Sequence, residues 1–260
     1  MAFVPTSALS GSDIADVRRI VAGHPVFALY FETALDALAN GLDNRSALIG
    51  GARQGAILSI DFDGLTIRTT IGALTPAELA LAPQTDRRAE LHLAPAHLAT
   101  VRRRCAARIE ATRTLRYYRL DTTTDLIADP RCRRLGPADL VMVTDFYRRH
   151  YPATVFSRWM LDEAFLGLFA DGELLACGGV ISRNARLAAA NVGNFLTHPA
   201  HRRRGLGRAL VASLVELLAG DGVRRFLLGA NADNIGACRA YEAVGFRLIE
   251  ARPQLDLAAA

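Results

Sequence analysis

Arginine and glycine residues stand together in one short segment, Arg202-Arg203-Arg204-Gly205-Leu206-Gly207-Arg208. An apolar stretch ends just before it at Thr197, and an apolar pattern with helical spacing begins at Leu206. The first N–H groups of a helix have no partner within the helix and carry partial positive charge, so they can bind an anion. Glycines leave that backbone open to a phosphate, and arginines add charge-assisted hydrogen bonds. The segment therefore predicts an anion site at the start of a helix.

A second set of residues follows about 25 positions later. Asn234, Ala237 and Tyr241 are three and four residues apart, a spacing that places them on one face of a helix. Gly245 then suits a left-handed helix cap, and Phe246 opens a further strand. Each set has a purely structural alternative, because two glycines also suit a tight turn and a tyrosine also packs in a core. The order and separation of the two sets favour the binding interpretation.

With both motifs in view, the segment from about Cys132 to Leu257 resembles the GCN5-related N-acetyltransferase (GNAT) superfamily. The phosphate-binding motif of that family, Gln/Arg-x-x-Gly-x-Gly/Ala, is matched from Arg202 to Gly207. Its later signature, Asn-x-x-Ala-x-x-x-Tyr-x-x-x-Gly-Phe, is matched from Asn234 to Phe246. The resemblance implies an α/β (α+β) GNAT fold, with a mixed, mostly antiparallel sheet flanked by helices. It also implies acetyl-CoA or another short acyl-CoA as co-substrate, and no metal.

The resemblance further implies roles for individual residues. A strand that splays from its neighbour would admit the pantetheine arm, Asn234 would contact the cofactor, and Tyr241 would lie near its sulfur. Tyr241 is the expected catalytic residue, acting mainly as a hydrogen-bond donor to the departing thiolate. The expected cofactor-binding residues come from the splayed strand, the phosphate turn and the later helix: Phe195, Leu196, Thr197, Arg202, Arg203, Arg204, Gly205, Leu206, Gly207, Arg208, Asn234, Ala237 and Tyr241.

The group that takes the proton of the amine is left open. Many members of the family have a glutamate on the strand before the phosphate turn, but residues 191–195 contain no carboxylate. A water relay and His198 are alternatives, although a loop histidine is usually only solvated. His150 and Tyr151 are candidates for contacts with the acceptor, and they also suit the end of a helix.

The elements that must position these residues can be outlined from periodicity and turn signals. The second half is expected to contain strands at 132–135, 165–170, 173–182, 187–197, 225–230 and from 246, and helices at 138–150, 158–163, 206–219 and 235–244. The first half is expected to contain helices from Ser12-Asp13 to Ala22, at 26–39 and at 95–108, and strands at 47–49, 56–61, 65–70 and 116–120. A hairpin turn is expected at Asp63-Gly64.

The length of 260 residues suits one large or two small domains, and we expect two. Periodicity breaks at 122–130, which predicts an N-terminal α/β domain at 1–127 and a GNAT domain at 128–260. The first half is similar to the N-terminal regions of two-part bacterial GNAT proteins, where it is often a smaller, degenerate copy of the fold. It has no Arg-x-x-Gly-x-Gly, and its glycine-rich segment Gly50 to Gly55 suits a turn. We expect one active site per chain, with the first half shaping the acceptor pocket or packing against it.

Composition sets the remaining expectations. Hydrophobic residues make up 51% and charged residues 22%, a balance typical of a globular protein. No apolar run reaches the roughly 18 residues of a membrane helix, and the cytoplasm is the expected location. The four cysteines lie far apart, which favours reduced thiols and argues against a metal site. All 31 basic residues are arginines, and the net charge is +5.

Three function classes follow. The first is an acyl-CoA-dependent N-acyltransferase that acts on a primary amine of a small molecule or peptide by direct attack in a ternary complex. The second is a catalytically weak CoA-binding regulatory module, which the missing carboxylate favours. Nucleic-acid binding through arginine clusters ranks last because aromatic residues are not interleaved with them. The acceptor amine, the preferred acyl chain and the oligomeric state are not encoded in any pattern that we recognise.

Overall fold

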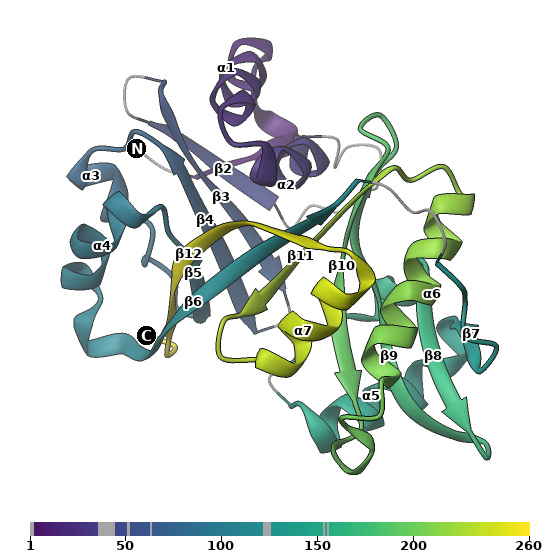
Figure 1. Cartoon of the computed structure of the whole chain (residues 1–260). Coiled ribbons are helices and arrows are strands. Elements are labelled where there is room, and N and C mark those ends of the chain that lie inside the picture. The colour runs from purple at the N-terminus through teal and green to yellow at the C-terminus, as the bar shows by residue number, and fades with distance from the viewer. Residues whose placement is uncertain are drawn as a thin grey trace. The chain divides into compact units, whose positions relative to one another are not determined.

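The computed structural model describes residues 3–35, 45–50, 53–62, 64–121, 126–152, 154 and 156–260 (Figure 1). Contacts divide the chain into two units, one of Met1–Arg116 with Glu250–Ala260 and one of Tyr117–Ile249. This division differs from the expected one at residues 127 and 128. Two long strands, β6 (Ile109–Leu120) and β12 (Arg247–Leu257), each supply residues to both units.

The first unit contains a sheet with helices on both faces. Its elements are β1 (Val4–Pro5), α1 (Gly11–Ala22), α2 (Pro25–Leu35), β2 (Arg45–Gly50), β3 (Gly55–Phe62), β4 (Leu65–Gly72), α3 (Pro76–Leu79), β5 (Arg88–His92) and α4 (Leu98–Arg104). The strand order is β1-β2-β3-β4-β5-β12. The β4–β5 pair is parallel, whereas the pairs β1–β2, β2–β3, β3–β4 and β5–β12 are antiparallel. Helices α1 and α2 lie on one face of this sheet, and α3 and α4 lie on the other (Figure 1).

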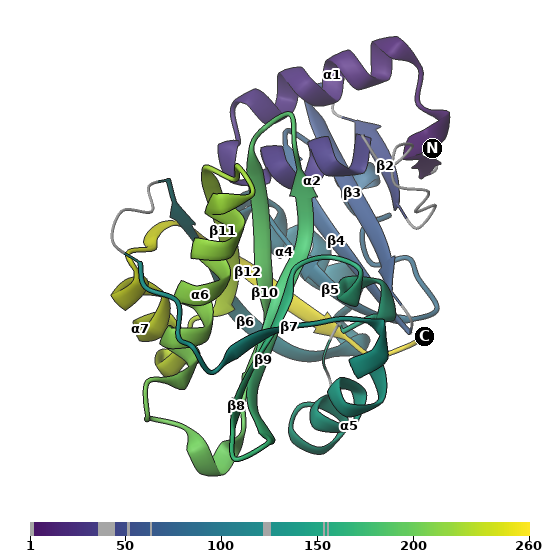
Figure 2. The same cartoon turned by 90° about the vertical axis from the view of Figure 1, so that its right-hand side faces the viewer.

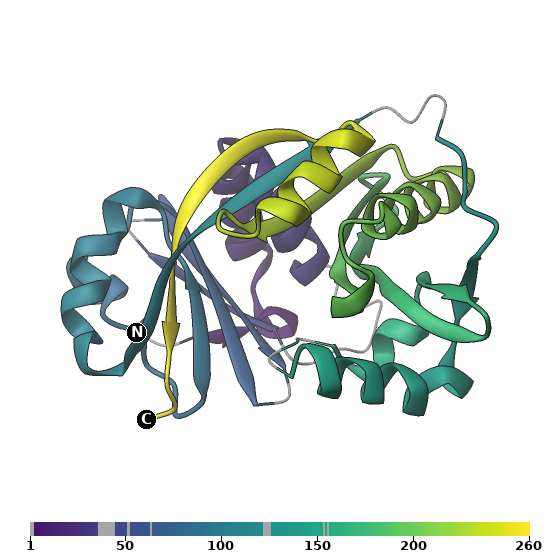
Figure 3. The same ribbon diagram turned by 60° about the horizontal axis from the view of Figure 1, so that its bottom comes forward.

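The second unit has the same kind of layered architecture. Its elements are β7 (Cys132–Leu135), α5 (Leu140–His150), β8 (Phe165–Ala170), β9 (Glu173–Asn184), β10 (Ala189–Thr197), α6 (Leu206–Gly220), β11 (Arg225–Asn231) and α7 (Ile235–Val244). The strand order is β6-β11-β10-β9-β8-β7, and the β10–β11 pair is parallel. Figures 2 and 3 show α5 on one face of the sheet and α6 and α7 on the other. The predicted mixed, mostly antiparallel sheet flanked by helices is confirmed.

The two units repeat one order of elements. Each runs strand, helix, second helical segment, three antiparallel strands, helix, parallel strand, helix and final strand. The second helical segment is α2 in the first unit and a 3-10 turn at Arg158–Leu161 in the second. The final strands are exchanged, because β12 pairs with β5 in the first unit and β6 lies beside β11 in the second. This repetition agrees with the expectation that the first half is a smaller, degenerate copy of the same fold.

The apolar face of α6 fixes that helix against the sheet of the second unit. Leu210 and Leu214 are completely buried, and Leu206 is 5% exposed. They belong to a core cluster that includes Val192 of β10 and Leu228 of β11. Full burial of each leucine contributes roughly 1.5–3 kcal/mol. The N-terminus of α6 is therefore held firmly beside the strand that precedes it.

Several elements differ from the sequence-based expectations. Ser10, not Ser12, caps α1, because its hydroxyl and the Asp13 carboxylate form a reciprocal capping box. The helix expected at 95–108 is the shorter α4 between two 3-10 turns, and 158–163 contains a 3-10 turn in place of an α-helix. Neither α3 nor β5 was predicted. The residues at 36–44, at position 63 and at 122–125, on which other expectations fell, lie outside the described part of the chain.

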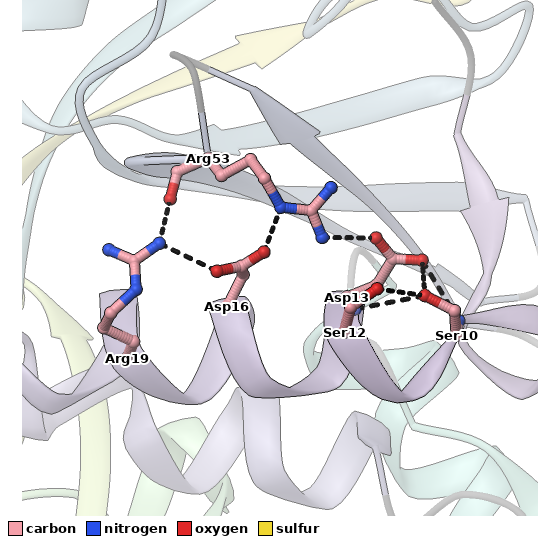
Figure 4. Close-up of polar contacts among 6 residues, drawn as sticks. All are labelled: Ser10, Ser12, Asp13, Asp16, Arg19 and Arg53. Carbon is pink, nitrogen blue, oxygen red and sulfur yellow. Dashed lines mark hydrogen bonds and ion pairs between the residues drawn. The ribbon is translucent and has the colours of Figure 1, made fainter.

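The glycine-rich turn between β2 and β3 is clamped to α1 (Figure 4). Arg53, with a left-handed φ of 67°, donates from its guanidinium to Asp13 at 2.7 Å and also to Asp16. Arg19 donates to Asp16 at 2.9 Å and to the Arg53 carbonyl at 2.6 Å. This network joins α1 to Arg53, a residue of the glycine-rich segment, through charged groups at the surface.

We expect this clamp to depend on pH. Hydrogen bonds from Arg19 and Arg53 hold the pKa of Asp16 below its ordinary value. A carboxylate with a depressed folded-state pKa stabilises the fold above its unfolded pKa of about 3.9, and this contribution is lost as pH falls through the folded value. Asp16→Asn should therefore lower the melting temperature at pH 7 by roughly 1–3 °C, since exposed ion pairs are weak. The difference from wild type should shrink as pH falls through the folded-state pKa of Asp16, as measured by circular dichroism at pH 7 and in acid.

Asp86→Asn is the matched control, because Asp86 is exposed and its carboxylate has no ion-pair partner among the described residues. Its melting temperature should follow wild type at both pH values. An Asp16→Asn protein as stable as wild type at pH 7 would show that the clamp contributes nothing.

Candidate functional site

Strands β10 and β11 pair along only part of their length. Their parallel register runs from Ala189↔Arg225 to Asn191↔Leu227 and ends there. β10 nevertheless continues to Thr197, where it still pairs with Ala176 of β9. The two strands thus part after Asn191, as a splayed strand pair requires.

The backbone groups of β10 alternate between β9 and the gap beside β11. The His198 N–H donates to the Leu175 carbonyl of β9 at 2.8 Å. In an antiparallel pair every second residue faces its partner strand, so Leu196 also directs its N–H and C=O toward β9. Phe195 and Thr197 face the opposite way, into the gap. Of the three strand residues predicted to contact a pantetheine arm, two therefore have their backbone groups on the open side.

Two residues in the turn after β10 have a left-handed backbone conformation. Arg203 has a φ of 63° and Gly205 a φ of 78°, on either side of Arg204. Gly205 is the N-cap of α6, and no side chain caps this helix. The N–H groups of the first turn therefore have no acceptor within the helix and point out of its end. A turn with alternating left-handed residues that leads into an uncapped helix has the backbone geometry of known anion sites.

Four arginines surround this turn: Arg202, Arg203, Arg204 and Arg208. All four are exposed, and among the residues that the structure describes none has a carboxylate within ion-pair distance. Arg202 donates to the Thr197 carbonyl at 3.3 Å, and Arg204 contacts the His201 ring at 2.9 Å. Their positive charge is thus uncompensated at the end of a helix that already attracts anions.

The equivalent position in the first unit is closed. There the helix after β4 is α3, which has only four residues, and Thr75 accepts a hydrogen bond from the Glu78 N–H at 3.3 Å. The Glu78 carboxylate in turn accepts from the Thr75 N–H at 2.7 Å. This capping box satisfies the donors and places a negative charge where an anion would bind. Every residue of β5 also pairs with β4, so that strand pair does not part.

Asn234 and Ala237 lie at the start of α7. The Asn234 carboxamide oxygen accepts a hydrogen bond from the Ala237 N–H at 3.2 Å and caps the helix. The sequence-based interpretation assigned Asn234 to the cofactor. The structure shows its oxygen engaged in the cap, so only the amide N–H groups are available for a ligand.

Tyr241 lies on α7 against the splayed strand. Its ring centroid is 6.0 Å from that of Phe195 and 6.2 Å from that of Tyr118. The residue is 7% exposed, and burial raises the pKa of its phenol above the ordinary value, with smaller contributions from Cys238 and Tyr118. Tyr241 is therefore protonated throughout the physiological range and can donate a proton or hydrogen bond.

His150 and His198 come together although they are 48 positions apart. Their ring centroids lie 4.3 Å from each other, and the Phe146 ring packs 5.2 Å from His150. The His198 ring nitrogen accepts from the Ala200 N–H at 3.2 Å, which ties it to the phosphate turn. Burial lowers the pKa of His150, and the neighbouring His198 and Arg149 lower it further. Tyr151, at the end of the same helix, is half exposed.

Tyr147, Met160 and Asn194 belong to no recognisable sequence motif, yet they contact one another at β10. Tyr147 of α5 donates a hydrogen bond to the Asn194 carbonyl, and the Asn194 amide contacts the Met160 sulfur at 3.1 Å. Asn194 has a left-handed φ of 53°. Each of these residues is ordinary in its local sequence, and only the folded chain brings them together at β10.

Neither a cluster of metal-ligating side chains nor a membrane-spanning helix is found in the described part of the chain. No group of three or more histidine, cysteine, aspartate or glutamate side chains there is arranged to hold a metal ion. No helix among the same residues is long and apolar enough to cross a bilayer.

Comparison with solved structures shows that this fold recurs. A putative GNAT-family acetyltransferase from Novosphingobium aromaticivorans is 22% identical, with a TM-score of 0.59 over 78% of this chain and 88% of the other. A GCN5-related N-acetyltransferase from Sphaerobacter thermophilus is 14% identical, with a TM-score of 0.60 over 98% and 95%. A Drosophila protein is 16% identical, with a TM-score of 0.71 over 99% and 98%. At these identities the likeness concerns the fold.

Comparison of sequences gives a more limited match. No curated protein matches this chain significantly. A model of the acetyltransferase (GNAT) family matches residues 139–246, which include β10, the turn at 198–205 and α7. Residues 139–246 therefore form a domain of the GNAT acetyltransferase family, and this chain carries a transferase domain.

Proposed function

We propose that the protein is an acyl-CoA-dependent N-acyltransferase that transfers an acetyl or other short acyl group to a primary amine of a small molecule or peptide. The observation that carries the proposal is the uncapped N-terminus of α6, which follows directly on a strand that has parted from its neighbour. A helix end of this kind suits a pyrophosphate, and a parted strand pair suits an amide-containing arm.

The phosphate turn would bind the pyrophosphate of coenzyme A. The N–H groups of Leu206, Gly207 and Arg208 are the first donors of α6, and the exposed arginines add positive charge. Gly207 lies near the strand, since a Cβ built there would be 3.5 Å from the Thr197 hydroxyl. The proposed diphosphate site at the start of α6 therefore lies close to the open side of β10.

The gap beside β10 would hold the pantetheine arm. The Phe195 carbonyl and the Thr197 N–H face it, and these groups can pair with the amides of the arm as a further strand would. A single pantetheine chain would thus replace the rungs that β11 does not supply after Leu227.

The chemistry requires little from the protein beyond alignment. The amine nitrogen bonds to the thioester carbon, the C–S bond breaks, the thiolate takes a proton and the amine loses one. Protonated Tyr241 is the proposed hydrogen-bond donor to the thiolate, because its phenol stays neutral and its ring packs on Phe195. The proton that the thiolate takes comes from water. Residues 191–195 offer no carboxylate as a base, so we propose that the amine proton leaves through water.

The same lack of a carboxylate favours a second candidate, a CoA-binding regulatory module with weak catalysis. The two candidates share the cofactor site and differ in turnover. Incubation of acetyl-CoA with the protein and a panel of primary amines separates them, because only the enzyme releases CoA in proportion to acylated amine.

The phosphate site can be tested at Gly205. Gly205→Glu forces a side chain into a left-handed position and brings a carboxylate to the anion site. CoA affinity measured by calorimetry should fall at least about 100-fold, because the variant repels the diphosphate and strains the turn.

Gly220→Glu is the matched control, since Gly220 is exposed, has open space around it and lies at the other end of α6. It should bind CoA as wild type does. Equal affinity of the Gly205→Glu variant and wild type would refute the assignment of this turn to the diphosphate.

The role of Tyr241 can be tested by removing its hydroxyl. Tyr241→Phe should lower kcat roughly 10- to 100-fold while the Kd for CoA changes little, because the ring still packs on Phe195. Since its pKa is raised, wild-type kcat should show no alkaline loss from Tyr241 below about pH 10. Steady-state kinetics across pH provide the measurement, and unchanged kcat in the variant would reduce Tyr241 to a packing residue.

A further inference from the structure

β10 contains one residue more than β9 at the point where the gap is open. Its register with β9 runs from Gly193↔Gly179 to Leu196↔Cys177, so β10 advances three positions while β9 advances two. Asn194 takes the left-handed conformation that such a bulge requires, with a φ of 53°. The bulge turns the Phe195 ring over Gly178, where no Cβ could fit.

Two contacts from outside the sheet hold this bulge. The Tyr147 hydroxyl donates to the Asn194 carbonyl, and the Asn194 amide donates to the Met160 sulfur at 3.1 Å. Tyr147 is 2% exposed, and its ring stacks on that of Phe156 at 5.2 Å. Because Tyr147 belongs to α5 and its ring is buried against Phe156, its hydroxyl has little freedom to move away from the Asn194 carbonyl.

This hydrogen bond also fixes the next donor on the strand. The peptide between Asn194 and Phe195 is planar and trans, so its C=O and N–H point in opposite directions. When Tyr147 holds the carbonyl on the α5 side, the Phe195 N–H must point away from it. Phe195 is also one of the residues whose backbone faces the gap and not β9. A hydrogen bond to the carbonyl further polarises the N–H of the same peptide and makes it a stronger donor.

We propose that Tyr147 is a positioning residue for acyl transfer, which orients and polarises the Phe195 N–H as the donor to the thioester carbonyl oxygen. The inference rests on the proposed function, because the oxygen that receives this hydrogen bond belongs to the bound acyl-CoA. Negative charge develops on that oxygen when the amine attacks, and an oriented donor stabilises it most at that moment. Tyr147 itself exchanges no proton and forms no bond to the substrate.

The state of Tyr147 agrees with this role. Burial raises the pKa of its phenol well above the ordinary value, with Cys177 contributing, so the hydroxyl remains a donor. The thiol of Cys177, whose pKa burial raises to about 12, is a second neighbour of the same hydroxyl. Cys177 is completely buried and opposes Leu196 in the register.

Tyr147→Phe tests the proposal, because it removes the hydroxyl and keeps the stacked ring. We expect kcat to fall on the order of tenfold while KM for acetyl-CoA stays within about twofold. The infrared carbonyl band of bound acetyl-CoA should shift toward the frequency of the free thioester. Amide hydrogen exchange should become faster at Leu196, whose N–H faces β9 directly after the bulge. Unchanged kcat together with an unchanged carbonyl band would overturn the proposal.

Cys177→Ala is the matched control. It removes the other neighbour of the hydroxyl and leaves the bond to the Asn194 carbonyl, so kcat and the carbonyl band should follow wild type. If Cys177→Ala lowered kcat as much as Tyr147→Phe, the effect would come from packing, and the proposal would fail. Hydrogen exchange at residues 194–197 needs no substrate. If wild-type protein did not bind CoA, the proposed function would fail, whereas the exchange data would still show whether Tyr147 fixes the bulge.

Discussion

The site in the second unit depends on a parallel pairing that ends early. β10 and β11 share three rungs and then part at Asn191 and Leu227. Backbone groups inside a sheet are normally paired, and leaving them unpaired is unfavourable unless a ligand or water satisfies them. Where the strands have parted, backbone groups on one side of β10 therefore have no partner in β11. The uncapped N-terminus of α6, which follows the C-terminal end of β10, attracts negative charge. A ligand with a diphosphate at one end and amides along its length suits both features.

The first unit shows what happens when the same topology lacks these two features. Its order of strands and helices is the same, yet β5 is paired along its whole length and α3 is capped by Thr75 and Glu78. The N–H groups at the start of α3 that are hydrogen-bonded in this capping box are not available to bind a phosphate. The difference between the units is therefore one of local hydrogen bonding, and it explains why a shared fold predicts a site in one and not in the other. The exchanged final strands, β6 and β12, explain why the unit boundary cannot follow a single break in the chain.

The bulge in β10 lies where this strand has parted from β11 and where α5 contacts it. A regular strand would alternate its groups strictly between its two neighbours, and a single inserted residue changes which side the following groups face. Asn194 supplies that residue, and contacts from α5 and from the turn at Arg158–Leu161 hold it. Elements on one face of the sheet thus fix the backbone of β10 at its bulge. Helices α6 and α7 cover the other face, and α7 carries Tyr241.

The sequence by itself determined the features that depend on near neighbours. Glycine at a left-handed helix start, apolar spacing along 206–219 and the Asn234 to Tyr241 periodicity follow from local sterics and helix geometry, and α6 and α7 begin close to where those patterns place them. The short elements α3 and β5 escaped prediction because four or five residues carry too little periodicity. Only the tertiary structure decided the contacts between distant residues. Tyr147 and Asn194 are 47 positions apart, the early end of the β10–β11 register has no sequence marker, and the pairing of β12 with β5 joins opposite ends of the chain. Such contacts follow from packing of whole elements, which no local pattern records.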